Sequence, residues 1–249
     1  MQFNERIKTY WEGEAEGYSQ GIERELRDFH RKAWKELILE YAPKKSELDI
    51  LDIGTGPGFF PIILSEGNHR VTGIDLTENM IRFAKKNLEA EGCEATLLSM
   101  DCHNLAFEDN SFDLVICRNL TWTLDNPSRA YEEWLRVLRT GGRLLVFDAC
   151  WYLHLFDEKK KKAYFEKEKE IKEKYGRKFH EHRNQAEGEE LSKKLFMSDK
   201  VRPLWDLEKM LSMGFSKVFA NCSIDKRTCN EMEIELHSLR PSFLVGGEK

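Results

Sequence analysis

Apolar residues near the start of the chain are spaced as on one face of a helix. They lie at i, i+4, i+7 and i+8 and are Phe3, Ile7, Tyr10 and Trp11. A break is expected at Gly13 and Gly17, and a second helical face runs through residues 26–41 and ends before Pro43. The pattern therefore predicts a helical amino-terminal segment over residues 1–46.

From residue 47 short apolar runs alternate with amphipathic stretches, which is typical of strands alternating with helices. Five strands are predicted, at Leu48–Ile53, Val71–Ile74, Thr96–Ser99, Phe112–Cys117 and Arg143–Phe147. The helices between them have recognisable ends, since Thr77 can cap one, Gly92 can end it, and Asn126-Pro127 can open another. Strands joined by helices form right-handed crossovers, so a parallel sheet is expected over residues 47–150.

Residues 151–202 interrupt this alternation with a charged insert. Opposite charges three or four positions apart fill Asp157–Lys178. A narrow apolar stripe there predicts an amphipathic helix and consists of Tyr164, Ile171, Tyr175 and Phe179. We expect this helix and the amino-terminal segment to form a cap over the carboxyl ends of the strands. Residues 203–249 are expected to complete the sheet with a helix at Pro203–Met213 and strands at Phe215–Ser223 and Ser242–Val245.

Composition excludes several classes of protein. The chain has 15 Phe, 6 Trp and 7 Tyr, too much apolar surface for intrinsic disorder, and no run approaches the ~20 apolar residues that span a bilayer. The net charge of −5 argues against a nucleic-acid partner, and the first residues lack an apolar secretory signal. The six cysteines form no CxxC pair, and His180 and His182 lack a metal-ligand spacing. We therefore expect a cytoplasmic protein with reduced thiols and no metal.

A glycine-rich loop follows the first predicted strand. It reads D-x-G-x-G-x-G, with Asp52, Gly54, Gly56 and Gly58, and it precedes a predicted helix. Glycines in such a turn let backbone N–H groups approach a ligand closely. Asp75 ends the next strand, where a carboxylate can accept both ribose hydroxyls. The spacing predicts a nucleotide-type cofactor at the ends of the first two strands.

These motifs resemble those of the class I S-adenosylmethionine (SAM)-dependent methyltransferases. The closest branch is the small-molecule one with the ubiquinone/menaquinone C-methyltransferase-like proteins (methyltransferase type 11), and the resemblance extends over residues 47–150. It implies an α/β, Rossmann-like, doubly wound fold with a seven-stranded, mostly parallel sheet in the order 3-2-1-4-5-7-6 and a helical cap. It also implies SAM as the methyl donor and S-adenosylhomocysteine as the product.

The same resemblance implies which residues bind SAM. In that family the glycine loop holds the methionine part, the acidic end of the second strand takes the ribose, and the acidic end of the third strand takes the adenine amino group. An amino-terminal tyrosine closes over the cofactor. The SAM-binding residues implied here are Tyr18, Asp52, Gly54, Thr55, Gly56, Gly58, Asp75, Leu76, Met80, Asp101, Cys102, Arg118 and Asn119.

Methyl transfer itself requires little from side chains. The methyl group passes in line from a sulfonium to a nucleophile, so alignment in a dry pocket contributes most. A base is needed only if the nucleophile must lose a proton. The candidates are His154, Tyr152, Asp148 and His30, and for each of them a structural or surface role is the simpler interpretation.

The acceptor is expected to be a small molecule. After the fourth strand the chain reads Arg118-Asn119-Leu120-Thr121, without the Asn/Asp-Pro-Pro-Tyr of amino-methylating nucleic-acid enzymes or the Pro-Cys of pyrimidine C5-methyltransferases. Three alternatives stay open: a non-catalytic SAM-binding module, a protein methyltransferase that docks through the charged insert, and an arsenic methyltransferase. The sequence leaves the acceptor atom and the oligomeric state open.

Overall fold

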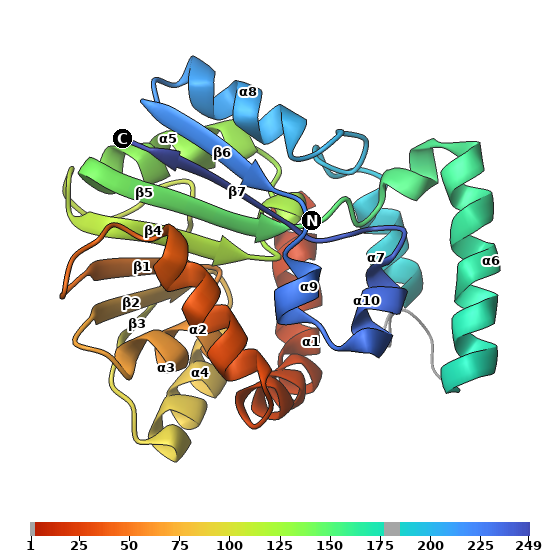
Figure 1. Ribbon diagram of the computed structural model, residues 1–249, viewed down its shortest axis with the longest axis horizontal. Helices are drawn as coiled ribbons and strands as arrows, with labels where there is room; N and C mark the ends of the chain where they lie inside the picture. The colour runs from red at the N-terminus through yellow and green to blue at the C-terminus, as the bar shows by residue number, and fades with distance from the viewer. Residues whose placement is uncertain (1–2, 177–184) are drawn as a thin grey trace.

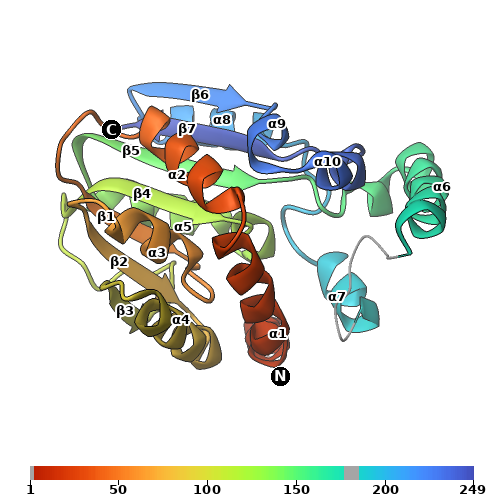
Figure 2. The same ribbon diagram turned by 60° about the horizontal axis from the view of Figure 1, so that its bottom comes forward.

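The computed structural model describes residues 3–176 and 185–249 and has a central sheet with helices on both faces (Figure 1, Figure 2). The seven strands lie in the order β3-β2-β1-β4-β5-β7-β6, which confirms the predicted order. Neighbours are parallel except for β7, which is antiparallel to both β5 and β6. The strands are Asp49–Ile53 (β1), Arg70–Asp75 (β2), Thr96–Ser99 (β3), Phe112–Arg118 (β4), Leu138–Asp148 (β5), Lys217–Asn221 (β6) and Phe243–Glu248 (β7).

Helices cover both faces of the sheet and also extend beyond its carboxyl edge. The α-helices are Phe3–Leu26 (α1), His30–Tyr41 (α2), Phe59–Ser65 (α3), Glu78–Glu91 (α4), Pro127–Val137 (α5), Glu158–Tyr175 (α6), Gln185–Ser192 (α7), Leu204–Ser212 (α8), Asp225–Thr228 (α9) and Glu231–His237 (α10). Two short 3-10 helices are Thr121–Thr123 (η1) and Leu153–Phe156 (η2). No helix of the described residues is both long enough and apolar enough to cross a membrane.

The core has two halves, one on each face of the sheet. Helices α1, α2 and α3 pack against Ile50 of β1, whereas α5 and α8 pack against Leu51, the next residue. Successive side chains of a strand point to opposite faces, so a strand buried on both sides must be apolar throughout. This is why the middle of β4, Leu114–Cys117, is a continuous apolar run and why β1 is apolar at Ile50, Leu51 and Ile53, with Asp52 as a buried exception. Both strands lie at the centre of the sheet.

The chain reverses its direction of winding between β1 and β4. From β1 it proceeds outward to β2 and β3, and then returns to the other side of β1 with β4. Open α/β sheets bind ligands beyond the carboxyl ends of the strands at such a switch point. Helix α1 runs past this edge (Figure 2).

The predicted break at Gly13 and Gly17 is wrong, because α1 continues through both glycines to Leu26. Both glycines are exposed, and a glycine in a helix costs only about 1 kcal/mol relative to alanine. On the opposite side Ala15 and Ile22 are buried against the domain. This burial outweighs the glycine cost, and the chain breaks instead between Leu26 and His30.

Thr77 does not cap α4 with its side chain as predicted. It occupies the N-cap position, but its hydroxyl donates to Asp75 at 2.7 Å. The carboxylate of Glu12 from α1 accepts instead from the backbone N–H groups of Glu78 (2.9 Å) and Asn79 (3.0 Å). The first turn of α4 is thus satisfied by a residue 66 positions away, which ties α1 to the domain. Gly92 does end α4 in the left-handed conformation as predicted.

Strand β5 begins earlier than predicted, at Leu138 rather than Arg143. Its pairing with β4 shifts register between Phe112, which pairs with Leu138, and Leu114, which pairs with Arg143. The additional residues of β5 form a bulge at this point. The helix before β5 accordingly ends at Val137. Asn126 caps that helix as expected, since its side chain accepts from the backbone N–H of Arg129.

The apolar stripe of α6 does not cover the strand ends. Tyr164 stacks on His154 with ring centroids 4.0 Å apart, and the Tyr175 hydroxyl donates to Glu235 of α10 at 2.7 Å. The stripe is therefore used in packing α6 onto η2 and α10, at the outer end of the molecule (Figure 1). Helix α7 of the same insert lies nearer, because Leu191 shares a small cavity with Trp11 and Trp122. Phe179, His180 and His182 lie outside the described residues.

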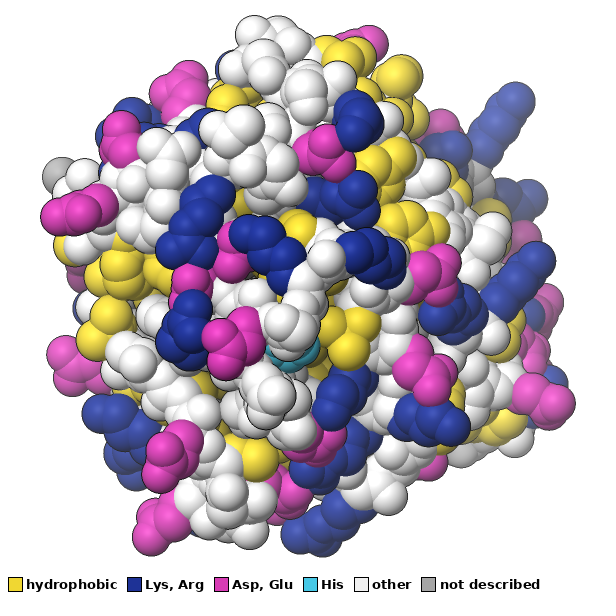
Figure 3. All heavy atoms as spheres, turned by 60° about the vertical axis from the view of Figure 1, so that its left-hand side comes forward, with side chains coloured by type: hydrophobic (Ala, Val, Ile, Leu, Met, Phe, Trp, Pro, Cys, Tyr) yellow, Lys and Arg dark blue, Asp and Glu magenta, His cyan; other side chains and the backbone are white. Residues whose placement is uncertain are grey.

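The surface carries mixed charge. On the face shown in Figure 3, basic and acidic side chains are interspersed over the whole area, without a continuous patch of one sign. Many of them form ion pairs, such as Arg70 with Asp49 and Arg31 with Glu66. All six cysteines are free thiols.

Candidate functional site

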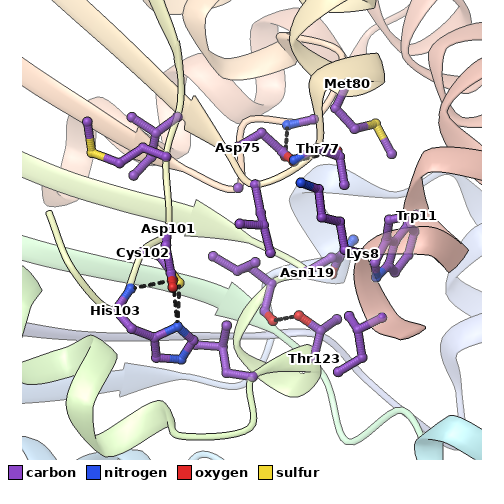
Figure 4. A pocket seen from close by; sticks show the side chains of 18 of the residues that line it. Lys8, Trp11, Asp75, Thr77, Met80, Asp101, Cys102, His103, Asn119 and Thr123 are labelled. Atoms are coloured by element: carbon purple, nitrogen blue, oxygen red, sulfur yellow. Dashed lines mark hydrogen bonds and ion pairs between the residues drawn. The ribbon is translucent and has the colours of Figure 1, made fainter. Parts of the chain in front are cut away.

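A pocket of about 270 Å³ lies beyond the carboxyl ends of β1, β2 and β4. Its walls come from the glycine loop, the ends of β2 and β3, the segment after β4, and α1 (Figure 4). Ten of the residues implied to bind SAM line it: Tyr18, Gly54, Gly56, Asp75, Leu76, Met80, Asp101, Cys102, Arg118 and Asn119. We call this the first pocket. The other three, Asp52, Thr55 and Gly58, lie outside its lining.

The glycine loop takes a conformation that other residues rarely adopt. The φ angles of Gly54, Gly56 and Gly58 are +67°, +52° and +90°. A Cβ at Gly58 would lie 3.0 Å from Leu88 and 3.2 Å from Ala84, so this glycine allows the loop to pack closely on α4. A Cβ at Gly56 would meet only Tyr18, at 3.7 Å, because this residue borders the open pocket.

Asp75 connects the loop to the end of β2. One carboxylate oxygen accepts from the backbone N–H of Gly56 (3.0 Å), and the other accepts from the N–H (2.9 Å) and hydroxyl (2.7 Å) of Thr77. Burial raises the pKa of Asp75, although these hydrogen bonds oppose the shift. Each carboxylate oxygen has two acceptor positions, so capacity remains on the Gly56 side for a hydroxyl in the pocket.

Beneath the loop lies a buried charged pair of opposite sign. Burial raises the pKa of Asp52 to about 7, while Thr55 and Arg118 lower it. Arg118, at the end of β4, donates to Glu25 of α1 at 2.7 Å and lies over the ring of Phe59 at 4.5 Å. The Arg118 guanidinium and the carboxyl groups of Asp52 and Glu25 are therefore gathered beneath the glycine loop.

Helix α1 supplies a wall that the sequence indicated only in part. Tyr18 was expected, but Ile7, Lys8 and Trp11 also line the first pocket. Trp11 packs edge to face on Tyr18 (6.2 Å) and on Trp122 (6.1 Å). The apolar spacing of residues 3–11 indicated a buried helix face, but not that this face would border a cofactor pocket.

The segment that follows β3 contributes one further residue to the lining of the first pocket, His103. His103, which sequence reasoning did not select, donates its backbone N–H to Asp101 at 2.9 Å, and its ring Nδ1 lies 2.7 Å from the same carboxylate. The signal in the sequence that could have identified His103 is its position two residues after Asp101. The neighbouring Cys102 is fixed through its backbone, because its carbonyl accepts from the indole N–H of Trp134 at 3.1 Å.

A second chamber of about 110 Å³ shares two lining residues with the first pocket, Arg118 and Asn119. Asn119 has φ +54°, and its backbone N–H donates to Phe147 at 2.8 Å, so the turn after β4 holds it between the two spaces. The second chamber is lined by Glu25, His30, Trp34, Arg118, Asn119, Phe147, Asp148, Trp151, Ile224, Thr228, Cys229, Glu233, His237 and Ser242. Most of these are polar, in contrast to the aromatic wall of α1.

Three of the four candidate bases, Asp148, His154 and Tyr152, have surroundings that favour a structural role. Asp148 is fully buried, and its carboxylate accepts from Trp122, Trp151 and Arg202, so it is committed to structure. His154 lies under Tyr164 outside both spaces, and burial lowers its pKa to about 4. Tyr152 lines the small cavity between α1 and α7 and packs on Trp122.

The fourth candidate, His30, lies in the second chamber. Its Nε2 is 2.9 Å from a carboxylate oxygen of Glu233, and the residue is 6% exposed. Its Nδ1 has no hydrogen-bond partner among the described residues, and the nearest carboxylate, on Asp28, is 3.6 Å away. Burial lowers the pKa of His30, but Glu233 together with the charges of Glu25 and Asp28 raises it, and the net direction is upward.

The fold is Rossmann-like, and the first pocket lies at the switch point of the sheet, where folds of this kind bind nucleotide-type cofactors. Residues 51–146 match the family model described as a methyltransferase domain. This match supports the class I SAM-dependent methyltransferase domain that the motifs of residues 47–150 predicted.

Two curated relatives illustrate the family. The chain is 29% identical over 157 residues to a ubiquinone/menaquinone biosynthesis C-methyltransferase of Roseobacter denitrificans, covering 57% of this chain and 63% of that protein. It is 35% identical over 120 residues to a demethylmenaquinone methyltransferase of Thermus thermophilus, covering 47% and 53%. The matches thus span between half and two thirds of these relatives.

Solved structures share the fold at low sequence identity. A SAM-dependent methyltransferase from Aquifex aeolicus superposes with a TM-score of 0.57 at 19% identity, over 92% of this chain and 97% of the other. The phosphoethanolamine N-methyltransferase 2 of Haemonchus contortus, with phosphomonomethylethanolamine and S-adenosylhomocysteine bound, gives 0.59 at 17% identity, over 87% and 52%. At this identity the likeness concerns the fold alone.

Proposed function

We propose that the protein is a SAM-dependent methyltransferase that holds SAM in the first pocket and a small polar acceptor in the second chamber. The observation that supports this most directly is that Asn119, which follows β4 at the switch point of the sheet, lines both spaces. In-line transfer needs donor and acceptor on opposite sides of one junction. A module that only senses SAM would have no need for the second space.

The first pocket suits each part of SAM. Asp75 is placed to accept the ribose hydroxyls, and Leu76 and Met80 are placed to border the adenine. The loop leaves room for the methionine part at Gly56, where Tyr18 would be the nearest neighbour of an added Cβ, at 3.7 Å. The sulfonium carries a positive charge, which would favour the ionised form of Asp52 beneath the loop.

The second chamber favours a polar acceptor over an apolar one. Two histidines, two glutamates and a cysteine line it, and buried polar groups need partners. We assign His30 as the base that takes the acceptor's proton, with Glu233 orienting the ring. The step breaks the bond from sulfur to methyl, forms the bond from acceptor to methyl, and leaves the proton on His30 and a neutral thioether.

The SAM assignment is tested by Asp75→Ala. The change removes the charged acceptor for the ribose and the brace on Gly56 N–H, and hydrogen bonds to charged groups are worth ~1.5–3 kcal/mol each. Calorimetry should show SAM affinity reduced about 10-fold or more. Asp109→Ala is the control, because that carboxylate is exposed and pairs with Arg136 away from the pocket. Equal SAM affinity in the two variants would contradict the ribose assignment.

The role of His30 is tested by His30→Gln. A positioned base contributes roughly 100-fold to 10,000-fold, so turnover with small thiols, amines and phenols as acceptors should fall by at least about 100-fold. SAM affinity should stay unchanged, since His30 lies outside the first pocket. His69→Gln serves as the matched control, because His69 lies at the opposite edge of the sheet, near Arg70. If both variants turn over alike, His30 is structural.

A further inference from the structure

Three side chains at the far wall of the second chamber bring together one oxygen, one sulfur and one nitrogen. Asp225 and Cys229 lie four residues apart at α9, and His237 ends α10. The Cys229 Sγ is 3.5 Å from Asp225 Oδ1 and 3.6 Å from His237 Nδ1, and these two atoms are 3.6 Å from each other. The three atoms therefore form a nearly equilateral triangle.

Hydrogen bonding accounts for only two edges of this triangle, the weak contacts of the Cys229 sulfur. A nitrogen and an oxygen that share a proton lie 2.7–3.2 Å apart, and the 3.6 Å between His237 and Asp225 is longer. The single thiol hydrogen of Cys229 can serve only one of the two neighbours at a time. Asp101 and His103 in the first pocket form a contrast, because their 2.7 Å separation is that of an ordinary hydrogen bond.

The separations match those of ligands around one zinc ion. Tetrahedral Zn²⁺ with bonds of ~2.0–2.1 Å to nitrogen or oxygen and ~2.3 Å to sulfur places its ligand atoms about 3.3–3.6 Å apart. All three observed edges are 3.5 or 3.6 Å, at the upper end of that range. A second carboxylate oxygen of Asp225 accepts from the N–H of Ser242 at 2.8 Å, which fixes that ligand from behind.

We infer that Asp225, Cys229 and His237 bind a Zn²⁺ ion whose fourth position faces the second chamber and takes the acceptor, a small thiol. Cys229 and His237 line that chamber, whereas Asp225 lies behind them. Three protein ligands with one open position are the arrangement of catalytic rather than structural zinc. Zinc is borderline soft, and a thiol that coordinates it is deprotonated.

The acceptor role rests on the proposed function, whereas the zinc site stands on its own geometry. The incoming thiol loses its proton to His30 in the same chamber and becomes a thiolate at the open position. Its lone pair then forms the sulfur–carbon bond to the methyl group of SAM, and the electron pair of the broken bond stays on the cofactor sulfur. The products are a methyl thioether and S-adenosylhomocysteine, with no oxidant or reductant needed.

Cobalt titration of the whole protein tests the site without relying on activity. Co²⁺ should bind one to one and give a thiolate charge-transfer band, and Zn²⁺ should displace it. Cys229→Ser should remove that band, and His237→Gln should weaken binding about 100-fold or more, since outer-shell partners alone are worth 10–100-fold. Cys102→Ser, in the other His–Cys–Asp cluster, should leave the spectrum intact.

Addition of one equivalent of 2-mercaptoethanol to the cobalt protein should then shift its visible bands as the fourth ligand is exchanged. Absence of tight binding by the unmutated protein, or a spectrum lost in Cys102→Ser but kept in Cys229→Ser, would overturn the site. Bands that do not respond to the thiol would overturn its assignment as acceptor. SAM affinity, measured on the same samples, reports on the proposed function separately.

Discussion

Gly56→Val is expected to abolish SAM binding while leaving the protein folded. Gly56 has φ +52°, a region that a β-branched residue occupies only with strain. Its Cβ would project into the first pocket, where Tyr18 is the nearest side chain at 3.7 Å. The added methyls would therefore fill the space meant for the methionine part, and strain would turn the N–H away from Asp75. We expect affinity to fall beyond the range of calorimetry, by more than about 100-fold.

Gly92→Val is the control that distinguishes the two effects of Gly56→Val, the loss of space in the pocket and the backbone strain. Gly92 ends α4 with φ +64°, and a Cβ there would meet nothing within 4 Å. The substitution therefore imposes similar strain far from the cofactor, and it should lower thermal stability while SAM affinity is kept. If Gly56→Val bound SAM as well as Gly92→Val does, the loop would be a structural turn only.

The parallel sheet was predictable because its signals are local. Short apolar runs alternate with stretches of helical period, and strands joined by helices form parallel pairs. The strand order and the SAM-binding residues were implied instead by the family resemblance, which rests on the glycine loop and on Asp75 and Asp101. Ten of these residues line the first pocket, because the strand ends share one edge of the sheet.

The second chamber was not predictable, because its wall is built by distant segments. Part of this wall comes from Cys229, which follows α9, and from Glu233 and His237 on α10. These helices are short and show no apolar periodicity, and only the folded chain brings them close to His30. The capping of α4 by Glu12 has the same origin. The predicted position of α6 over the strand ends differs from the structure for a related reason. An apolar stripe shows that a helix face is covered, but it does not show which element covers it.

Arg202→Leu should produce the largest loss of stability. Arg202 is 1% exposed and donates to two carboxylates that are themselves fully buried, Asp148 at 2.8 Å and Asp206 at 2.7 Å. It also donates to the Thr121 hydroxyl at 2.6 Å. Removing one partner of a buried ion pair costs roughly 3–5 kcal/mol, because the remaining charge has lost both solvent and counter-ion.

The same network supports the site. Asp148 accepts from the backbone N–H of Trp122, so it fixes the turn that follows Asn119 at the junction of the two spaces. Loss of Arg202 should therefore lower turnover even under conditions in which the variant is folded. The free energy of unfolding, from urea titration at several pH values, measures the first effect, and kcat measures the second.

The pH dependence of that variant identifies the cause. Without Arg202, Asp148 and Asp206 must be buried either as unpaired anions or in protonated form, so folding takes up protons. Stability of the variant should therefore recover as the pH falls, and the deficit should be larger at high pH. Arg70→Leu is the control, since Arg70 is exposed and a surface ion pair such as the one it forms with Asp49 contributes little to stability. Equal losses in both variants, independent of pH, would mean that Arg202 acts by packing and not by charge.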